Sequence, residues 1–254
     1  MYKTIRTPLA NLYKNHSFKS EQVSQALMGE NVKVLDSYDS WYKIEQWDYY
    51  ESWVHSFYLV DYLEKSNDMY FFDNHTNELI CDSGEKVFVP FGVSLPKLKF
   101  DKNIVTVLMP SRCTAQYIIP DSKIFDSKVD RLIYNASKFT GVHYHWGGIS
   151  TFGCDCSGFV QTLYKSISIE LPRDSSMQFN QSHEISLENV SSGDLLFFSE
   201  KNKINHVAIA KDNSKIIHCS GYVKEESIDS RHINFNASLM GKFHGSMTVE
   251  GLKL

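Results

Sequence analysis

The sequence predicts an α+β protein in which one or two small all-β modules precede a mixed domain of helices and strands. In about the first 120 residues, short runs rich in Val, Ile, Tyr, Phe and Trp alternate with turn residues. After Pro120 the apolar residues change to helical spacing, and these helical segments are followed by apolar strand-like runs. Hydrophobic residues make up 42% of the 254 residues, so the chain can bury a substantial core.

The front half divides into two sets of strand-like runs. The first set lies in VKVLDSYDSWYKIEQWDYYESWVHSFYLV and the second in KVFVPFGVSLPKLKF and NIVTVLMP, with the polar EKSNDMYFFDNHTNEL between them. Runs spaced by about 8–12 residues are typical of small barrels or sandwiches. We therefore expect one β module at 1–64, and a second, degenerate module or a β linker at 65–122.

The remaining residues, 123–254, are expected to form one α+β domain. DSKVDRLIYNASKFTGV has helical spacing, with Gly141 as the expected C-terminal stop. The glycine-rich YHWGGISTFG is a loop by composition, and CSGFVQTLYKSIS predicts a second helix. DLLFFS, HVAIAK and KIIHCSG predict consecutive buried strands.

Composition argues against several classes of protein. The net charge is −4 and no long basic run is present, so the sequence predicts no nucleic-acid partner. No stretch approaches the roughly 20 apolar residues of a membrane span. No apolar run of signal-peptide length follows Met1, so we expect a cytoplasmic protein, or a secreted one if a leader was removed. The five cysteines are odd in number and irregularly spaced, which argues against a disulfide framework.

Two of these cysteines, Cys154 and Cys156, are one residue apart in GCDCSGFVQTLY. A structural zinc site usually needs four ligands in paired units, but no second Cys pair exists, and His143 and His145 would have to fold back. A disulfide within so small a loop would be strained. The remaining interpretation is a nucleophile: Cys156 lies at the first turn of the predicted helix, where the backbone N–H groups and the helix dipole favour a thiolate.

A nucleophilic thiol also needs a base, usually a histidine oriented by a third polar group. His206 in NHVAIAK and His218 in KIIHCSG are the candidates. Each is embedded in an apolar run, where a histidine is often only a buried, hydrogen-bonded core residue. Neighbouring antiparallel strands, however, would place both on one face and let His218 bind the other ring nitrogen of His206.

The second half resembles the NlpC/P60 cysteine peptidases, with which it shares six motifs in the same order and approximate spacing: YHWGG, GCDCSGFVQTLY, LPRDSSMQ, GDLLFF, NHVAIA and IIHCSG. These are papain-like enzymes that hydrolyse bacterial cell-wall peptides. The resemblance implies Cys156 as nucleophile, His206 as base and His218 as the residue that orients it, with no metal or other cofactor. It also implies that the Tyr144 hydroxyl joins the Cys156 N–H in the oxyanion hole.

LPRDSSMQ has two interpretations. Asp174 or Ser175 could simply cap a short helix. A subgroup with bacterial SH3-like modules, the γ-D-glutamyl-L-diamino acid endopeptidases (dipeptidyl-peptidase VI type), has Arg-Asp-Ser at this point. By this resemblance Asp174 would pair with the free amine of the substrate's L-Ala, Ser175 would help bind the peptide and Arg173 would shape the subsite.

The first 64 residues resemble a bacterial SH3 module, from the leading ANLY through GENVKVL and SWYKI to YYESWVHSFYL. Related sequences have turn glycines where this chain has Tyr49 and Ser52, so we expect that turn to differ. Tyr50 stands where the subgroup has a tyrosine that reaches the substrate amine.

The resemblance predicts a murein-peptide hydrolase that cuts the bond between γ-D-Glu and an L-diamino acid, meso-DAP or L-Lys, through a thioester. Two alternatives remain open. The chain could be a non-catalytic cell-wall or peptide-binding protein, or a papain-like amidase that acts on intact peptidoglycan.

Overall fold

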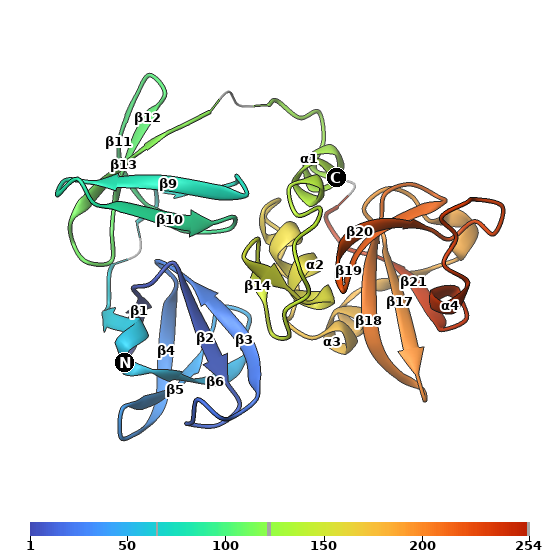
Figure 1. Cartoon of the computed structure of the whole chain (residues 1–254), viewed down its shortest axis with the longest axis horizontal. Coiled ribbons are helices and arrows are strands. Elements are labelled where there is room, and N and C mark those ends of the chain that lie inside the picture. The colour runs from blue at the N-terminus through green and yellow to red at the C-terminus, as the bar shows by residue number, and fades with distance from the viewer. Residues whose placement is uncertain (65, 121–122, 253–254) are drawn as a thin grey trace. The chain divides into compact units, whose positions relative to one another are not determined.

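The computed structural model describes residues 1–64, 66–120 and 123–252. The chain forms two compact units, Met1–Ile124 and Phe125–Leu254, coloured blue to green and green to red in Figure 1. The first unit contains strands, and the second combines helices with strands, which confirms the predicted α+β class. The predicted boundaries at 64/65 and 122/123 involve residues 65 and 122, which lie outside the described residues.

The first part of the front unit is a seven-stranded sheet in the order β3-β2-β6-β5-β4-β1-β7, with the short 3₁₀ helix η1 (Ser56–Tyr58) before its last strand. Its strands are β1 (Tyr2–Ile5), β2 (Leu9–Tyr13), β3 (Gln22–Leu27), β4 (Asn31–Tyr38), β5 (Trp41–Glu45), β6 (Glu51–His55) and β7 (Leu59–Asp61).

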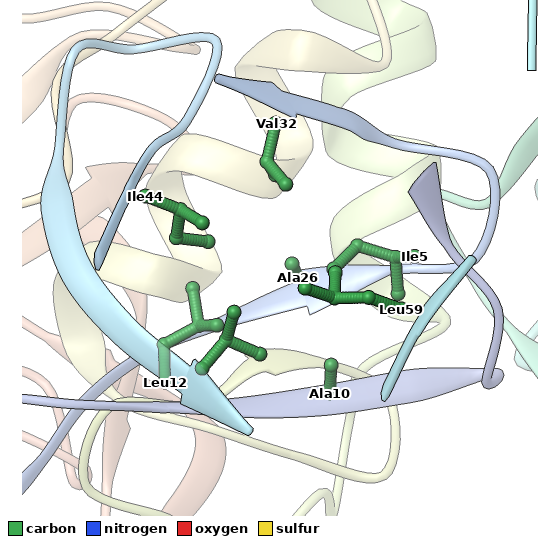
Figure 2. Close-up of a cluster of buried hydrophobic side chains, with 8 residues drawn as sticks. Ile5, Ala10, Leu12, Ala26, Val32, Ile44 and Leu59 are labelled. Atoms are coloured by element: carbon green, nitrogen blue, oxygen red, sulfur yellow. The ribbon is translucent and has the colours of Figure 1, made fainter. Parts of the chain in front are cut away.

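Inward-facing residues of these strands form one hydrophobic core, in which Figure 2 shows the labelled side chains gathered. Ala10 and Leu12 in β2 illustrate the period of two that brings alternate residues to the same face of a strand. The core consists of Ile5, Ala10, Leu12, Ala26, Val32, Ile44, Val54 and Leu59. Burying a large apolar side chain contributes about 1.5–3 kcal/mol, so this cluster is the main stabilising feature of the module.

The segment around the start of β6 carries Tyr49 and Ser52 where related sequences have glycines. Tyr49 has φ +64°, and its N–H donates to the carbonyl of Gln46 at 3.1 Å. Tyr49 therefore has the left-handed backbone conformation that a glycine would adopt without strain. Its side chain is 82% exposed. Ser52 lies inside β6 and is buried.

The rest of the front unit is a six-stranded antiparallel sheet in the order β10-β9-β13-β12-β11-β8. Its strands are β8 (Met69–Phe71), β9 (Thr76–Cys81), β10 (Lys86–Pro90), β11 (Ser94–Asp101), β12 (Ile104–Leu108) and β13 (Thr114–Ile118).

The second unit is built on a six-stranded sheet in the order β16-β21-β17-β18-β19-β20. Its strands are β16 (His183–Ile185), β17 (Leu195–Glu200), β18 (Lys203–Ala210), β19 (Lys215–Ser220), β20 (Tyr222–Ser227) and β21 (Phe243–Thr248), and β14 (Ile149–Ser150) pairs with β15 (Gly153–Cys154) separately. Its helices are α1 (Lys128–Ser137), α2 (Cys156–Lys165), α3 (Ser175–Gln181), α4 (Ala237–Met240) and the 3₁₀ helix η2 (Leu187–Asn189). The three predicted buried strands are confirmed as β17, β18 and β19.

Helix α1 forms where helical spacing predicts it, but it ends at Ser137, before the expected stop at Gly141. The Ser137 hydroxyl donates to the Tyr134 carbonyl at 2.6 Å, and the N–H of Phe139 bonds the Ala136 carbonyl at 3.1 Å in a tighter turn. Phe139 is nevertheless fully buried, because it packs against a residue of α2. None of the helices in the described ranges is long and apolar enough to span a membrane.

Candidate active site

Cys156 is the first residue of α2, and the residue before it caps that helix. Asp155 has extended backbone, and its Oδ1 accepts a hydrogen bond from the N–H of Gly158 at 2.7 Å. Its Oδ2 accepts from the N–H of Gly147 at 2.9 Å. One carboxylate therefore fixes both the start of the helix and the YHWGG loop beside the cysteine.

The backbone of the YHWGG loop packs directly against the backbone of α2. A Cβ atom on Gly158 would lie 2.1 Å from the Gly148 carbonyl oxygen, and a Cβ on Gly148 would lie 2.4 Å from the Gly153 carbonyl oxygen. Both spacings exclude any side chain, so these glycines hold the loop against the first turn of α2.

The sulfur of Cys156 lies against the edge of β18. Its Sγ is 4.0 Å from the Asn205 carbonyl oxygen. Strands β18 and β19 pair at Ile209–Ile217 and Ala210–Ile216, and the contact with Cys156 lies beyond these pairs, toward the start of β18. The sulfur therefore lies against the backbone of Asn205, the residue that precedes His206.

Burial controls the ionisation of Cys156, whose side chain is almost inaccessible. Burial, reinforced by the Asp155 carboxylate, raises the pKa of the thiol to about 12, although the N–H of Val207 and the Arg173 charge oppose the shift. The expectation that the helix start would favour a thiolate is therefore wrong for the free site, because desolvation outweighs the backbone N–H groups and the Arg173 charge that lower the pKa of the thiol. At neutral pH the free site holds a thiol.

His206 on β18 and His218 on β19 lie on one face of the strand pair, as their positions in the sequence predict. The Nε2 atom of His206 is 2.7 Å from Nδ1 of His218. Burial, followed by the neighbouring His218, lowers the pKa of His206 to about 3, and burial also lowers the pKa of His218. Both rings are therefore neutral at pH 7, and the contact with His218 uses Nε2 of His206 rather than its Nδ1.

Two further residues, not predicted from the sequence, extend this chain. Nε2 of His218 lies 3.1 Å from Oε2 of Glu226, and Asn236 donates from Nδ2 to the same oxygen at 2.5 Å. Nζ of Lys224 lies 2.9 Å from the other carboxylate oxygen. The only signal in the sequence was the run of charged residues in YVKEES, since the contact depends on the pairing of β20 with β19.

Tyr144 lies near the thiol. Its N–H donates to the Gly221 carbonyl at 2.8 Å, and its backbone bridges to Cys154. Burial, followed by the nearby Cys156 and Asp155, raises the pKa of the phenol well above its usual range. The hydroxyl therefore stays protonated and can act as a hydrogen-bond donor.

Arg173 is turned inward, with 2% of its surface exposed. Its Nη2 is 2.6 Å from Oδ2 of Asp155, and Nη1 donates to Oδ1 at 3.0 Å and to the Ser157 hydroxyl at 3.0 Å. This two-point contact braces the start of α2. Any effect of the guanidinium on a substrate is thus indirect, and the predicted shaping of the subsite stays a prediction.

Asp174 follows at the N-cap position of α3, and Ser175 is the first residue of that helix. The Asp174 side chain makes no cap hydrogen bond, and its carboxylate has no ion pair within the described ranges. Burial raises the pKa of this carboxyl, and Asp155 adds to the shift while Arg173 opposes it. This half-buried carboxylate, which has no ion pair in the part of the chain that the structure describes, is available for a cationic group.

Tyr50, the remaining predicted site residue, belongs to the first unit. It lies in the turn between β5 and β6, where its N–H donates to Oδ1 of Asp48 at 3.2 Å and its carbonyl accepts from Gln46 at 3.0 Å. Its contact with a substrate stays a prediction.

The five cysteines are free thiols. Across the residues that the structure describes, no three His, Cys, Asp or Glu side chains gather as metal ligands. The site brings together a thiol, a neutral imidazole pair linked to a carboxylate, and a phenolic donor.

Comparison with known proteins identifies two regions of the chain. Residues 141–239 match the NlpC/P60 family, and residues 8–60 match the bacterial SH3 domain. The chain is 30% identical over 220 residues to a gamma-D-glutamyl-L-lysine dipeptidyl-peptidase of Bacillus cereus, a match that covers 77% of this chain and 66% of the relative. It is 38% identical over 90 residues to the protein of the same name in Bacillus subtilis, and this match covers 34% of this chain and 30% of that relative.

These matches span less than two thirds of the length of either relative. Among solved structures, an NlpC/P60 family protein from Bacillus cereus superposes with a TM-score of 0.88 over 98% of this chain and 99% of its own, at 23% identity. That similarity concerns the fold of the whole chain.

Proposed function

The chain belongs to the NlpC/P60 family and carries a bacterial SH3 domain ahead of its NlpC/P60 domain, and from this premise we propose that it is a cysteine peptidase of cell-wall peptides. Its substrate is a short murein peptide that begins with an unblocked L-Ala. The bond cut is the one between γ-D-Glu and the L-diamino acid, meso-DAP or L-Lys. The names of the two Bacillus relatives support this choice of bond.

One observation carries the proposal: the carboxylate of Asp174, which has no ion pair among the residues that the structure describes, lies beside the motif residues that hold the nucleophile. Asp174 directly follows Arg173, which is bonded to the cap of the nucleophile's helix. A primary ammonium group forms a charge-assisted hydrogen bond to such a carboxylate, whereas an N-acylated terminus leaves the carboxylate unpaired. The amine therefore sets the distance between the end of the substrate and the bond that is cut, and Ser175 helps to bind the peptide.

In the reaction, the proton of the Cys156 thiol passes to Nδ1 of His206 as the sulfur attacks the γ-carbonyl carbon. The backbone N–H of Cys156 and the hydroxyl of Tyr144 donate to the oxyanion. The protonated His206 then gives its proton to the leaving amine as the C–N bond breaks and a thioester forms. Water, deprotonated by His206, hydrolyses the thioester and restores the thiol.

The substrate test uses four peptides: L-Ala-γ-D-Glu-meso-DAP, L-Ala-γ-D-Glu-L-Lys and the N-acetylated form of each. We expect mass spectrometry to detect release of L-Ala-D-Glu from the free peptides only. Cleavage of the acetylated forms at an equal rate would remove the role of Asp174 and favour an amidase that acts on intact wall. Cleavage of none would favour the non-catalytic binding protein.

Replacement of the nucleophile tests the chemistry. We expect Cys156→Ala to abolish peptide cleavage, because no other group on α2 can form the thioester. Cys113→Ala, in the first unit, is the matched control and should keep the wild-type rate. Cleavage by the Cys156→Ala protein at the wild-type rate would contradict the cysteine mechanism.

A further inference from the structure

The Glu226 carboxylate contacts His218, and the geometry of this contact determines which nitrogens of His206 and His218 carry protons. We propose that Glu226, held in place by Asn236, fixes His218 and, through it, His206 in their Nε2–H tautomers, so that Nδ1 of His206 is the base that faces Cys156. Glu226 is thus a positioning residue, separated from the sulfur by the two imidazoles. Its catalytic consequence rests on the proposed function, but the tautomers themselves do not.

The donors and acceptors along the chain allow one neutral arrangement. An ionised carboxylate accepts hydrogen bonds only, so Nε2 of His218, 3.1 Å from Oε2 of Glu226, must carry the proton. A neutral imidazole has one N–H, which makes Nδ1 of His218 an acceptor. The 2.7 Å contact with His206 then requires a proton on Nε2 of His206, and its Nδ1 is left with a lone pair.

The carboxylate is kept ionised by its neighbours. Burial opposes ionisation, but hydrogen bonds from Asn236 and Lys224 and the nearby His218 outweigh it and lower the pKa of Glu226. The orientation of the Asn236 amide follows from its second bond: its Oδ1 caps α4 by accepting from the N–H of Leu239 at 2.9 Å. The NH₂ group must therefore face Glu226, to which it donates at 2.5 Å.

The sheet makes this arrangement rigid. Strand β20 pairs with β19 so that Lys224 lies opposite His218, and Glu226 lies opposite Ile216. Glu226 and His218 thus project from one face of adjacent strands, as a diagonal cross-strand pair. With 16% of the Glu226 side chain exposed, water competes little for the carboxylate.

The charged side chains that face the imidazole pair, Lys224 and Glu226, come from β20, which pairs with β19. On α2, Sγ of Cys156 lies 4.0 Å from the carbonyl oxygen of Asn205, the residue before His206. Lys224 disfavours a positive charge on the rings, and Glu226 favours one. Glu226 therefore also stabilises the imidazolium that forms when the thiol loses its proton.

The first test observes the wild-type protein without substrate and uses variants only to assign the signals. In the wild-type protein labelled with ¹⁵N-histidine, long-range ¹H–¹⁵N spectra at pH 7 should show His206 and His218 as neutral rings protonated at Nε2. Assignment comes from His206→Gln and His218→Gln spectra. A proton on Nδ1 of either ring would overturn the proposal.

The second test measures the reactivity of Cys156 toward iodoacetamide at pH 7, followed by mass spectrometry of its peptide. We expect Glu226→Gln to slow alkylation and to lower kcat/KM about tenfold, the equivalent of one pKa unit. Glu226→Asp keeps the charge and should recover part of both rates. The matched control is Glu225→Gln, since Glu225 is exposed and pairs with Lys211 instead.

Equal alkylation rates for wild type and Glu226→Gln would overturn the positioning role. If alkylation depends on Glu226 but none of the murein peptides is cut, the proposed function fails and the positioning role stands. If the peptides are cut at the same rate by wild type and Glu226→Gln, the positioning role fails and the function stands. Melting temperatures identify a variant that is merely unfolded, and the wild-type spectra decide the question in that case.

Discussion

At the scale of single residues, two neighbours in the LPRDSSMQ motif have opposite environments. Arg173 is buried and bonded at two points to Asp155, whereas the Asp174 carboxylate lacks an ion pair in the described part of the chain. The Arg173 contact stabilises the start of α2, whereas the Asp174 carboxylate is available to bind a ligand. Substitutions should therefore separate a loss of stability from a loss of substrate recognition.

Asp174→Asn should lower kcat/KM for the free-amine peptide about 10- to 100-fold, because one hydrogen bond to a charged group is worth about 1.5–3 kcal/mol. The same change should raise the melting temperature at pH 7. Burial raises the pKa of Asp174, so its favourable contribution exists at low pH and is lost as the pH rises through the folded-state pKa. Asparagine is uncharged, so it avoids the free-energy cost of burying an ionised carboxylate at neutral pH.

Steady-state kinetics and thermal unfolding of the same Asp174→Asn preparation check both effects. An unchanged kcat/KM together with a lower melting temperature would show that Asp174 has a structural role only.

Arg173→Met should cost about 3–5 kcal/mol of unfolding free energy, because it leaves the buried Asp155 carboxylate uncompensated. Arg173→Lys should recover only part of this, since an ammonium group cannot reproduce the two-point contact. Urea denaturation measures both variants. The control is Arg231→Met, whose ion pair with Asp229 is exposed and should contribute little. Equal stability of the Arg173→Met and Arg231→Met proteins would contradict the bracing role.

At the scale of elements, the motifs predicted from the sequence are those whose chemistry lies within one segment. Cys156 and His206 could be proposed from the sequence because each belongs to a contiguous motif on its own helix or strand. Glu226 and Asn236 were missed because their contact depends on β20 lying beside β19 and on the N-terminus of α4 lying close to it. Such contacts arise from sheet order, which no local periodicity encodes.

The same limit applies to pKa values. A helix N-terminus can be predicted from a capping residue, but the depth at which α2 buries Cys156 cannot, and burial reverses the expected shift. Turn geometry can be predicted from the sequence only in part. The substitution at Tyr49 suggested a different turn, whereas the hydrogen bond to Gln46 preserves the left-handed backbone at that position.

Tyr49→Gly should therefore raise the unfolding free energy by up to about 1 kcal/mol. The left-handed conformation costs a side-chain-bearing residue roughly 1–2 kcal/mol, and the entropy that glycine loses offsets part of the gain. The control is Tyr38→Gly in β4, an exposed strand position where glycine should destabilise the fold. Chemical denaturation measures both, and a loss of stability in the Tyr49→Gly protein would contradict strain at this turn.

At the scale of the whole molecule, the buried neutral histidines make stability depend on pH. The pKa of His206 is lowered to about 3 in the folded state from an ordinary value near 6.5. The unfolded chain therefore binds one more proton than the folded chain between these values, and stability falls as the pH is lowered through this window. The slope is about 1.4 kcal/mol per pH unit for one full proton.

Urea denaturation at pH 7 and pH 5 should show this loss in the wild type and a smaller loss in His206→Gln. His183→Gln, which changes an exposed histidine, is the control and should behave as the wild type does. Equal pH dependence in the wild type and His206→Gln would mean that His206 is not buried in its neutral form.

The ion pair between Asp155 and Arg173 has a consequence for redesign of this protein. It joins the segment that carries Cys156 to the segment that carries Asp174, across 18 positions of sequence. A loop transplanted from another peptidase to change the substrate preference would have to bring its own arginine or the aspartate partner along with it. New specificities should therefore be accessible through exchanges that keep this pair together, and a library that varies residues 172–175 alone should consist largely of unstable proteins.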